Sequence, residues 1–151
     1  MWQTGPFLTA TASGADPAGT GFPILCGCDG RADTVAGKSG NLSTGRTTDH
    51  WFDTSAFTVP QNNIGRFGDA AVGSLIGPGT SSLSFAVQKK IYFTERTGLQ
   101  FGTQIANLFN HTNLDVPNTL FNSGQFGKIT NVQTAEGAAP RVIQFSLRLF
   151  F

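Results

Sequence analysis

Charged side chains are scarce in this sequence. Lys, Arg, Asp and Glu make up 13% of its 151 residues and leave a formal net charge of +1, which is about half the charge content of an average soluble domain. Because there is no strong field of either sign, we expect no nucleic-acid partner. In place of charge the chain has uncharged polar residues, 19 Gly, and 14 Phe beside a single Tyr. That mixture is typical of extended chain whose side chains alternate between two environments.

Long apolar runs are also missing. No stretch approaches the roughly 20 apolar residues of a membrane-spanning helix, and helical spacing of apolar residues does not persist over about three turns. Residues 1–6 lack the basic and apolar regions of a signal peptide. Taken alone, such a chain would stay in the cytoplasm. We favour the alternative that Met1 lies inside a longer reading frame whose N-terminal part is missing.

Motifs for catalysis and metal binding are lacking as well. Cys26 and Cys28 form a bare C-x-C pair that cannot complete a tetrahedral zinc site, so they are two incidental loop thiols or one strained disulfide. His50 is interpreted as a solvated loop residue and His111 as a turn residue, because no nucleophile motif accompanies them. No phosphate-binding or dinucleotide fingerprint occurs. We therefore predict that the protein is not an enzyme and has no catalytic residues, no metal ligands and no cofactor.

Alternation of apolar and polar side chains is the pattern that the sequence does contain, most clearly in residues 141–151. At about 3.3 Å per residue this segment spans about 36 Å, enough to cross a bilayer when tilted. Successive side chains of a strand point to opposite faces. The apolar face would hold Ile143, Phe145, Leu147, Leu149 and Phe151, and the polar face Gln144, Ser146 and Arg148.

Residues 82–93 and 99–109 alternate in the same way. The apolar face of the first is interrupted by Lys89. Residues 94–98 between the two segments are short, polar and end in glycine, as is typical of a hairpin. A weaker fourth strand is predicted over residues 2–10, where Pro6 restricts it to a sheet edge or a strand end.

Long irregular segments, residues 11–81 and 110–140, separate these strands. Loops beyond about 15 residues are uncommon in compact soluble domains, whereas outer-membrane barrels have short turns at one rim and long loops at the other. The order of elements puts the chain end on the short-turn, periplasmic side. The predicted fold is therefore all-β, an antiparallel meander of three to four strands with long loops that forms a partial, C-terminal segment of a transmembrane β-barrel.

Several motifs over residues 45–151 are recognisable. In chain order they are GRTTDHWFDTSAF at 45–57, IGRFG at 64–68, IGPG at 76–79, FTER at 93–96, LQF at 99–101, ANLFNHTN at 106–113 and PRVIQF at 140–145, followed by a terminal Phe. Residues 31–33 extend the pattern weakly upstream. With these motifs the sequence resembles Oar-like TonB-dependent receptors, which are outer-membrane proteins whose N-terminal part carries a carboxypeptidase-regulatory-like domain.

The resemblance implies a barrel of about 22 strands around an internal plug, and energy-coupled solute uptake across the bacterial outer membrane. Only three or four strands are present here, without the plug, the TonB-contacting segment or the regulatory-like domain. We therefore expect a fragment that does not transport by itself. The implied partners are the remainder of the receptor barrel and plug, outer-membrane lipid, and TonB through the missing N-terminal part alone.

The terminal strand also resembles the signal read by the barrel-assembly machinery, which is a terminal aromatic residue preceded by apolar residues at alternate positions. Its physical basis would be β-augmentation, in which an exposed strand edge pairs with a strand of the machinery. A compatible alternative is that these are ordinary lipid-facing residues. The signal residues would be Ile143, Phe145, Leu147, Leu149 and Phe151.

Inside such a barrel, one sheet face would line the lumen and the other would meet lipid. Near the predicted periplasmic rim, Lys89, Lys90 and Arg96 would meet anionic headgroups or solvent. In an extracellular loop, Trp51, Phe52 and Phe57 contact a ligand or only pack the loop, and we favour packing. The predicted lumen-facing residues are Gln88, Gln100, Gln104, Gln144 and Arg148, and the predicted lipid-facing residues are Phe85, Phe101, Ile105, Phe145 and Leu147.

The rival interpretation is a soluble β-sandwich-like binding or surface module. It requires the apolar faces of residues 83–93, 99–109 and 143–151 to pack against one another, with the loops free to bind a partner.

Overall fold

The computed structural model describes residues 1–151 except 15, 20–29 and 136. The described chain consists of antiparallel strands and one short 3₁₀ helix, η1 (Thr54–Ala56), and none of its helices is long and apolar enough to cross a membrane. The prediction of an all-β antiparallel fold is confirmed. Cys26 and Cys28, whose role the sequence leaves open, lie outside the described residues.

The chain divides into two compact units, which we describe separately. The first, here called the sheet unit, consists of Met1–Thr4, Gly79–Leu114 and Val132–Phe151. The second, here called the loop unit, consists of Gly5–Pro78 and Asp115–Asn131.

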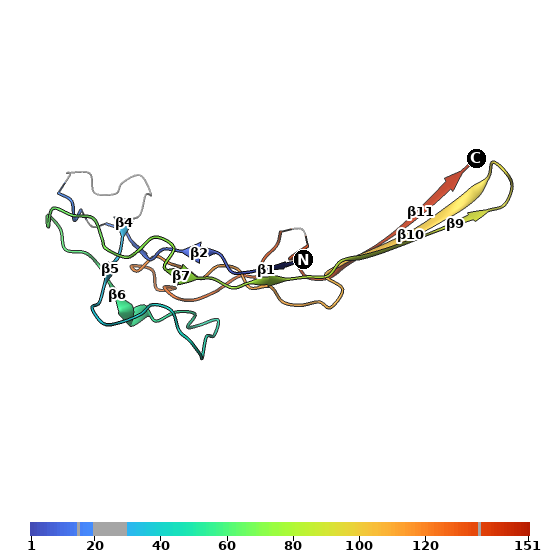
Figure 1. The fold of residues 1–151 in the computed structure, drawn as a ribbon. Coiled ribbons are helices and arrows are strands. Elements are labelled where there is room, and N and C mark those ends of the chain that lie inside the picture. Colours follow the sequence, from blue (N-terminus) through green and yellow to red (C-terminus); the bar gives the residue numbers. More distant parts are fainter. Residues whose placement is uncertain (15, 20–29, 136) are drawn as a thin grey trace. The chain divides into compact units, whose positions relative to one another are not determined.

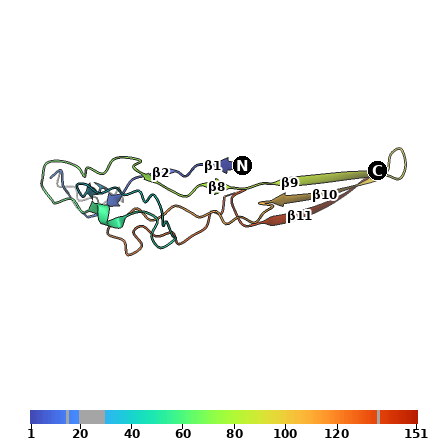
Figure 2. The ribbon, with the colours of Figure 1, turned by 60° about the horizontal axis from the view of Figure 1, so that its bottom comes forward.

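Three strands form the main sheet of the sheet unit (Figures 1 and 2). They are β9 (Phe85–Tyr92), β10 (Gly98–Ala106) and β11 (Val142–Phe150). β10 is central and pairs antiparallel with both neighbours. These strands occupy the segments whose apolar and polar residues alternate, with bounds that differ from the predicted ones by one to three residues at each end.

Residues 93–97 connect β9 to β10 as a tight turn. The Phe93 N–H donates to the Thr97 carbonyl at 2.9 Å, and the Thr97 N–H donates to the Thr94 hydroxyl at 3.0 Å. Gly98, predicted as the end of the turn, instead opens β10 opposite Phe150, where a Cβ would lie 2.5 Å from the Phe150 ring. Because Gly98 and Phe150 are paired, the turn and the C-terminus share one end of the sheet (Figure 1).

The predicted strand over residues 2–10 is divided in the structure. β1 (Trp2–Gln3) pairs with β8 (Thr80–Ser81), and β2 (Phe7–Leu8) pairs with β7 (Leu75–Ile76). The interruption at residues 4–6 follows from Pro6, which has no N–H to donate to a ladder. β1 is not part of the three-stranded sheet, so that sheet has three strands rather than four.

A buried asparagine ends β10. Asn107 takes a left-handed backbone conformation with φ of 51° and is fully buried. Its Nδ2 donates to the carbonyls of His111 and Ala139 at 2.9 and 3.0 Å, while its Oδ1 accepts from the His111 N–H at 3.0 Å. This one side chain therefore joins the end of β10 to the segment that leads into β11.

Asn113 makes a second connection of the same kind. Its Nδ2 donates to the Ala138 carbonyl at 2.9 Å, and its Oδ1 accepts from the Ser81 N–H at 2.8 Å. Gln133 extends the network, because its Nε2 donates to the Leu114 carbonyl at 2.9 Å. Side-chain amides thus organise those parts of the predicted loop 110–140 that belong to the sheet unit.

The loop unit, which includes most of the predicted irregular segment 11–81, has a core of its own. In addition to the pair β2 and β7, the loop unit contains two antiparallel strand pairs. β3 (Thr11–Ala12) pairs with β4 (Gly30–Arg31), and β5 (Asp33–Thr34) pairs with β6 (Phe57–Thr58). Strands of two residues are too short to show alternation in a sequence, which is why this unit was predicted as irregular chain. The buried core consists of Ala10, Ala12, Ala32, Phe52, Ala56, Phe57, Ala70 and Leu75.

Aromatic rings dominate that core. Phe52 meets Phe57 and Phe126 edge to face, with ring centroids 6.0 and 5.1 Å apart, and Phe126 also meets Phe121 at 5.2 Å. The preceding Trp51 is half-buried and donates from its indole N–H to the Ile76 carbonyl at 2.9 Å. The prediction that these aromatic residues pack the loop is confirmed for Phe52 and Phe57, which are 1% and 5% exposed.

Two of the recognisable motifs, residues 31–33 and 64–68, meet in the loop unit. Arg66 forms a two-pronged ion pair with Asp33, at 2.6 Å from Nη1 to Oδ1 and 2.9 Å from Nη2 to Oδ2. Gly68 lies so close to the Arg31 carbonyl that a Cβ on it would sit 1.8 Å from that oxygen. Gly68 is needed because only a residue without a side chain can approach the Arg31 backbone this closely. Arg66, two residues earlier, neutralises the carboxylate of Asp33.

This ion pair predicts a pH dependence. The Arg66 hydrogen bonds are the largest influence on Asp33 and lower the pKa of its carboxyl below the ordinary value of 3.8, outweighing the burial that raises it. Because the folded-state pKa is the lower one, the stabilisation is complete above about pH 4 and is lost as the pH falls through the folded value. Asp33→Asn is expected to destabilise the loop unit by about 2 kcal/mol at neutral pH.

Fluorescence of Trp51 in a Trp2→Phe background measures this effect during thermal unfolding between pH 7 and pH 2. The variant should show a smaller loss of stability in acid than the parent. A residual loss is expected in both, because hydrogen bonds from Ser55 also lower the pKa of Asp53. Identical acid profiles would contradict the assignment.

Candidate functional site: the two faces and open edges of the sheet

The register across β9, β10 and β11 sorts the main sheet into two faces. Odd-numbered residues form what we call the apolar face, in the rows Phe85–Ile105–Ile143, Val87–Thr103–Phe145, Lys89–Phe101–Leu147 and Ile91–Leu99–Leu149. Even-numbered residues form what we call the polar face, in the rows Ala86–Gln104–Gln144, Gln88–Gly102–Ser146, Lys90–Gln100–Arg148 and Tyr92–Gly98–Phe150. All five predicted lipid-facing residues share the apolar face, and all five predicted lumen-facing residues share the polar face.

Large side chains on the apolar face are exposed. Phe145 is 71% and Leu147 69% exposed, and the Phe145 ring stacks on Phe101 with centroids 6.2 Å apart. A contiguous exposed apolar surface marks a contact with a membrane or a partner. Strands of this length span about 30 Å, which at a tilt of about 40° covers nearly the roughly 25 Å of an outer-membrane apolar band.

The polar face carries amides, hydroxyls and two cations. Gln100 donates from Nε2 to Oε1 of Gln88 at 3.0 Å. Gly102, between Gln88 and Ser146, leaves room there, since a Cβ on it would lie 2.5 Å from the Ser146 hydroxyl. Nearest the turn, the rings of Tyr92 and Phe150 meet edge to face across Gly98, with centroids 5.6 Å apart.

Both edges of the sheet are open. β9 and β11 are the outer strands, and no other strand in the described part of the chain pairs with them there. A closed membrane barrel needs about eight strands or more, so three strands with two open edges do not close into a barrel by themselves. The predicted assembly-signal residues lie on the apolar face of β11, and Phe151 follows it at 95% exposure. Their recognition by the assembly machinery stays a prediction.

Comparison with known families decides the class of protein. The profile described as Outer membrane beta barrel domain matches residues 1–144. The chain belongs to this family. It is therefore an outer-membrane β-barrel protein, located in the bacterial outer membrane, and the three-stranded sheet is a partial barrel wall. Searches of curated proteins and of solved structures gave no match.

Membership of this family removes the soluble sandwich as an explanation of the alternation. That interpretation needs the apolar faces of three segments to pack against one another from two sheets. In the structure the three segments are neighbours in one sheet, and their apolar residues lie side by side on the same face. They leave a surface suited to lipid instead of forming a protein core.

The remaining candidate residues are placed as follows in this outer-membrane protein. His50 and His111 are exposed, and the structure holds His111 through its backbone, which bonds to Asn107. Within the described residues, no group of three or more His, Cys, Asp or Glu side chains gathers as a metal site. Arg96 is exposed in the turn, whereas Lys89 and Lys90 lie on opposite faces of β9.

Sequence reasoning missed the structural role of Asn107 and Asn113. Both are buried polar residues, 0% and 3% exposed, and both bond to the backbone of distant segments. The signal that would have found them is the repeated Asn in ANLFNHTN at 106–113, since Asn tolerates left-handed backbone and its amide satisfies backbone donors and acceptors. Asn107 and Asn110 do take that conformation, with φ of 51° and 52°.

Proposed function

We propose that this chain is the C-terminal part of a TonB-dependent receptor barrel of the Oar-like type. In the intact receptor it takes part in energy-coupled uptake of a solute across the outer membrane, and it does not transport by itself. Its apolar face meets lipid and its polar face lines the lumen against the plug. The barrel-assembly machinery reads β11, and TonB engages only the N-terminal part that this chain lacks.

The observation that carries the proposal is that the recognisable motifs supply contacts between distant residues within each unit. In the loop unit, the motif at 45–57 supplies Phe52 and Phe57 to the core, while the motif at 64–68 reaches back to residues 31–33. In the sheet unit, the motif at 106–113 connects β10 to the segment before β11. Motifs that are far apart in the sequence thus supply core and connecting residues to the two units. This favours a resemblance to the receptor family that reflects a shared fold over a chance resemblance of several short motifs.

We further infer that the protein is not an enzyme. Its two histidines are exposed, and within the described residues they bond to side chains through their backbone: the His50 N–H donates to the Thr47 hydroxyl at 3.1 Å, and the His111 N–H donates to Oδ1 of Asn107 at 3.0 Å. The polar face offers side-chain amides and cations, which suit a surface that lines the barrel lumen and binds polar groups.

Fractionation of the native host tests the proposal. An antibody against residues 141–151 is applied to outer-membrane and soluble fractions on a denaturing gel, with and without boiling. We expect an outer-membrane band far larger than the 16.0 kDa of this chain, whose mobility changes on heating as barrels unfold. A soluble band of this chain's own mass would overturn the receptor assignment.

A further inference from the structure

The loop unit contains a polar cavity with a volume of about 400 Å³, which is within the usual size range of small-ligand sites. Its wall comes from three parts of the chain, namely Thr11 of β3, the segment 115–120 and the segment 128–131. All of them belong to the loop unit. Most of the lining residues have polar side chains, so a ligand that fits this cavity must itself be polar.

Backbone hydrogen bonds hold the wall of this cavity in place. The Asp115 N–H donates to the Asn131 carbonyl at 3.1 Å, and the Asn118 N–H donates to the Lys128 carbonyl at 2.9 Å, so the two segments run antiparallel. A further backbone bond of 2.8 Å joins the first segment to Thr11 of β3. Because the wall is already ordered, a ligand would pay little for arranging it.

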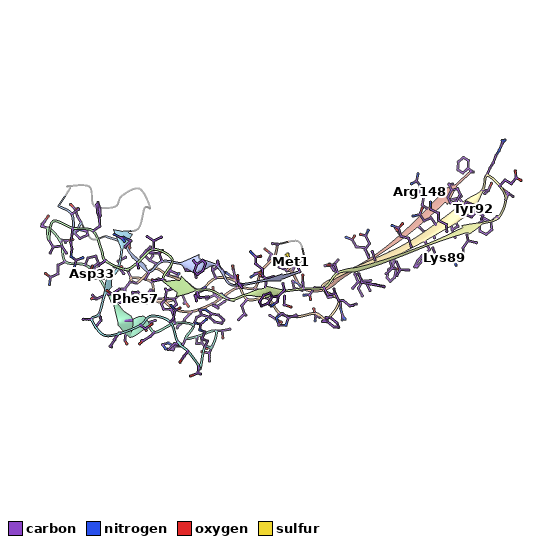
Figure 3. The ribbon with its side chains drawn as sticks, viewed as in Figure 1. Met1, Asp33, Phe57, Lys89, Tyr92 and Arg148 are labelled. Carbon is purple, nitrogen blue, oxygen red and sulfur yellow. The ribbon has the colours of Figure 1, made fainter. Side chains whose placement is uncertain are left out.

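Two opposite charges line the cavity without pairing with each other. Asp115 and Lys128 are both half-buried. Asp33, labelled in Figure 3, instead uses its carboxylate for the ion pair with Arg66, the one ion pair found in the described chain. One oxygen of Asp115 accepts from the Val116 N–H at 2.8 Å, and neither its other oxygen nor the Lys128 ammonium has a partner among the described residues. Half-buried charges without partners favour a ligand that supplies both opposite charges.

The spacing of the two charges argues against a free amino acid as that ligand. Since Asp115 faces Asn131 and Lys128 faces Asn118, three positions of extended chain, about 10 Å, separate the two charged residues along the segments. The ammonium and carboxylate of a free amino acid are attached to one carbon atom and cannot lie that far apart. An extended peptide of about three residues spans about 10 Å. The cavity therefore fits the two charged ends of a short peptide.

Uncharged polar groups complete the lining. The Oδ1 of Asn118 accepts from the Leu120 N–H at 2.9 Å, which leaves its Nδ2 as a donor. The side chains of Thr130 and Asn131 are exposed, and they have no hydrogen-bond partner in the part of the chain that the structure describes. Amides and hydroxyls donate to carbonyls and accept from N–H groups, which are the groups of a peptide backbone between its charged ends.

We propose that this cavity binds a short peptide of about three residues whose two ends are free. Asp115 receives the N-terminal ammonium, and Lys128 receives the C-terminal carboxylate. The binding site depends only on the loop unit. Making the peptide the solute that is taken up rests on the proposed function.

Calorimetric titration of the full-length protein, purified in detergent from its own outer membrane, tests the site. The probe is trialanine with both ends free, compared with N-acetyl-trialanine, trialanine amide, alanine and glucose. We expect trialanine to bind, and each blocked derivative to bind about tenfold more weakly. The proposal is overturned if trialanine does not bind at millimolar concentration, if the blocked forms bind equally well, or if alanine or glucose binds more tightly.

Variants assign each charge of the cavity to one end of the peptide. Asp115→Asn should abolish the effect of N-acetylation, and Lys128→Met should abolish the effect of C-terminal amidation. Asp49→Asn and Lys38→Met are the matched controls, because both residues are exposed in the same unit and line no part of this cavity. An affinity loss that is the same for free and blocked peptides would contradict the pairing. If a variant fails to assemble, the blocked peptides on the parent protein decide, because they remove the same charges from the ligand.

Uptake of radiolabelled trialanine by cells with and without TonB separates the site from the proposed function. Binding without TonB-dependent uptake would support the site and contradict the proposed function. TonB-dependent uptake that continues at the full rate in both Asp115→Asn and Lys128→Met would overturn the site and leave the receptor assignment intact.

Discussion

Leu147→Arg is expected to destabilise the assembled barrel by about 2–4 kcal/mol, the cost of a cation at the lipid-facing midplane of an outer-membrane barrel. Leu147 is 69% exposed on the apolar face, in one row with Lys89 and Phe101. Arginine there must leave water for hydrocarbon, or bend the strand to avoid it. Urea titration of the full-length protein refolded into phospholipid vesicles measures the difference in free energy of unfolding.

Ser146→Arg is the matched control, since it adds the same side chain one position away on the polar face. Gly102 opposite Ser146 offers room for the larger side chain, and the lumen keeps the cation hydrated. We expect a cost well below that of Leu147→Arg. Equal costs at the two positions would show that the faces do not separate lipid from lumen, and the face assignment would fall.

Asn107→Ala should be the most destabilising single change in the sheet unit, at about 3–4 kcal/mol. It removes three hydrogen bonds worth about 1 kcal/mol each, and it places a non-Gly, non-Asn residue in left-handed backbone at a further cost of about 1 kcal/mol. The backbone groups of His111 and Ala139 lose a partner whose own side chain is fully buried. The same vesicle titration measures this change.

Asn110→Gly is the control for Asn107→Ala. Asn110 shares the left-handed conformation, with φ of 52°, but it is exposed and accepts one hydrogen bond, from the Arg141 N–H at 3.1 Å. Glycine tolerates the backbone, so the expected loss is below about 1 kcal/mol. If both variants lose the same stability, the buried amide of Asn107 is not what connects β10 to the segment before β11.

The packed core of the loop unit bears on how this outer-membrane protein presents its surface. Long loops of outer-membrane barrels are often imagined as free chain, yet here Phe52, Phe57 and Phe126 form a cluster of rings. Asp33 and Arg66 add an ion pair at 2.6 Å. A unit with its own core and ion pair holds its exposed residues in fixed positions.

Sequence reasoning predicted the main sheet because a strand has a fixed period. Side chains two residues apart share a face, so the order Phe145, Ser146, Leu147, Arg148 determines which residues lie together before any partner strand is known. The register places all five predicted lipid-facing residues on one face and all five predicted lumen-facing residues on the other. That the two faces meet lipid and lumen stays a prediction. The turn at 93–97 was predictable for a similar reason, since it joins two alternating segments through a few polar residues.

The loop unit and the asparagine connections were not predictable in this way. Strands of two residues, such as β5 and β6, show no period, and they exist because Phe57 and Leu75 bury their side chains together with small alanines. Asn107 reads in the sequence as an ordinary turn residue. Its importance comes from Ala139, 32 positions away, whose carbonyl it bonds.

The sequence by itself determined the class of this protein: poor in charge, alternating, without a long helical pattern, and with an apolar face and a polar face on each long strand. Those properties depend on the local geometry of extended chain. Only the tertiary structure decided that the three apolar faces lie on one side of one sheet with open edges. The same holds for Lys90 and Arg148, which are 58 positions apart in the sequence and flank Gln100 in one row. The physical reason is that strand register and contacts between distant residues depend on which segments pair in the folded chain. The local alternation of apolar and polar residues does not specify that pairing.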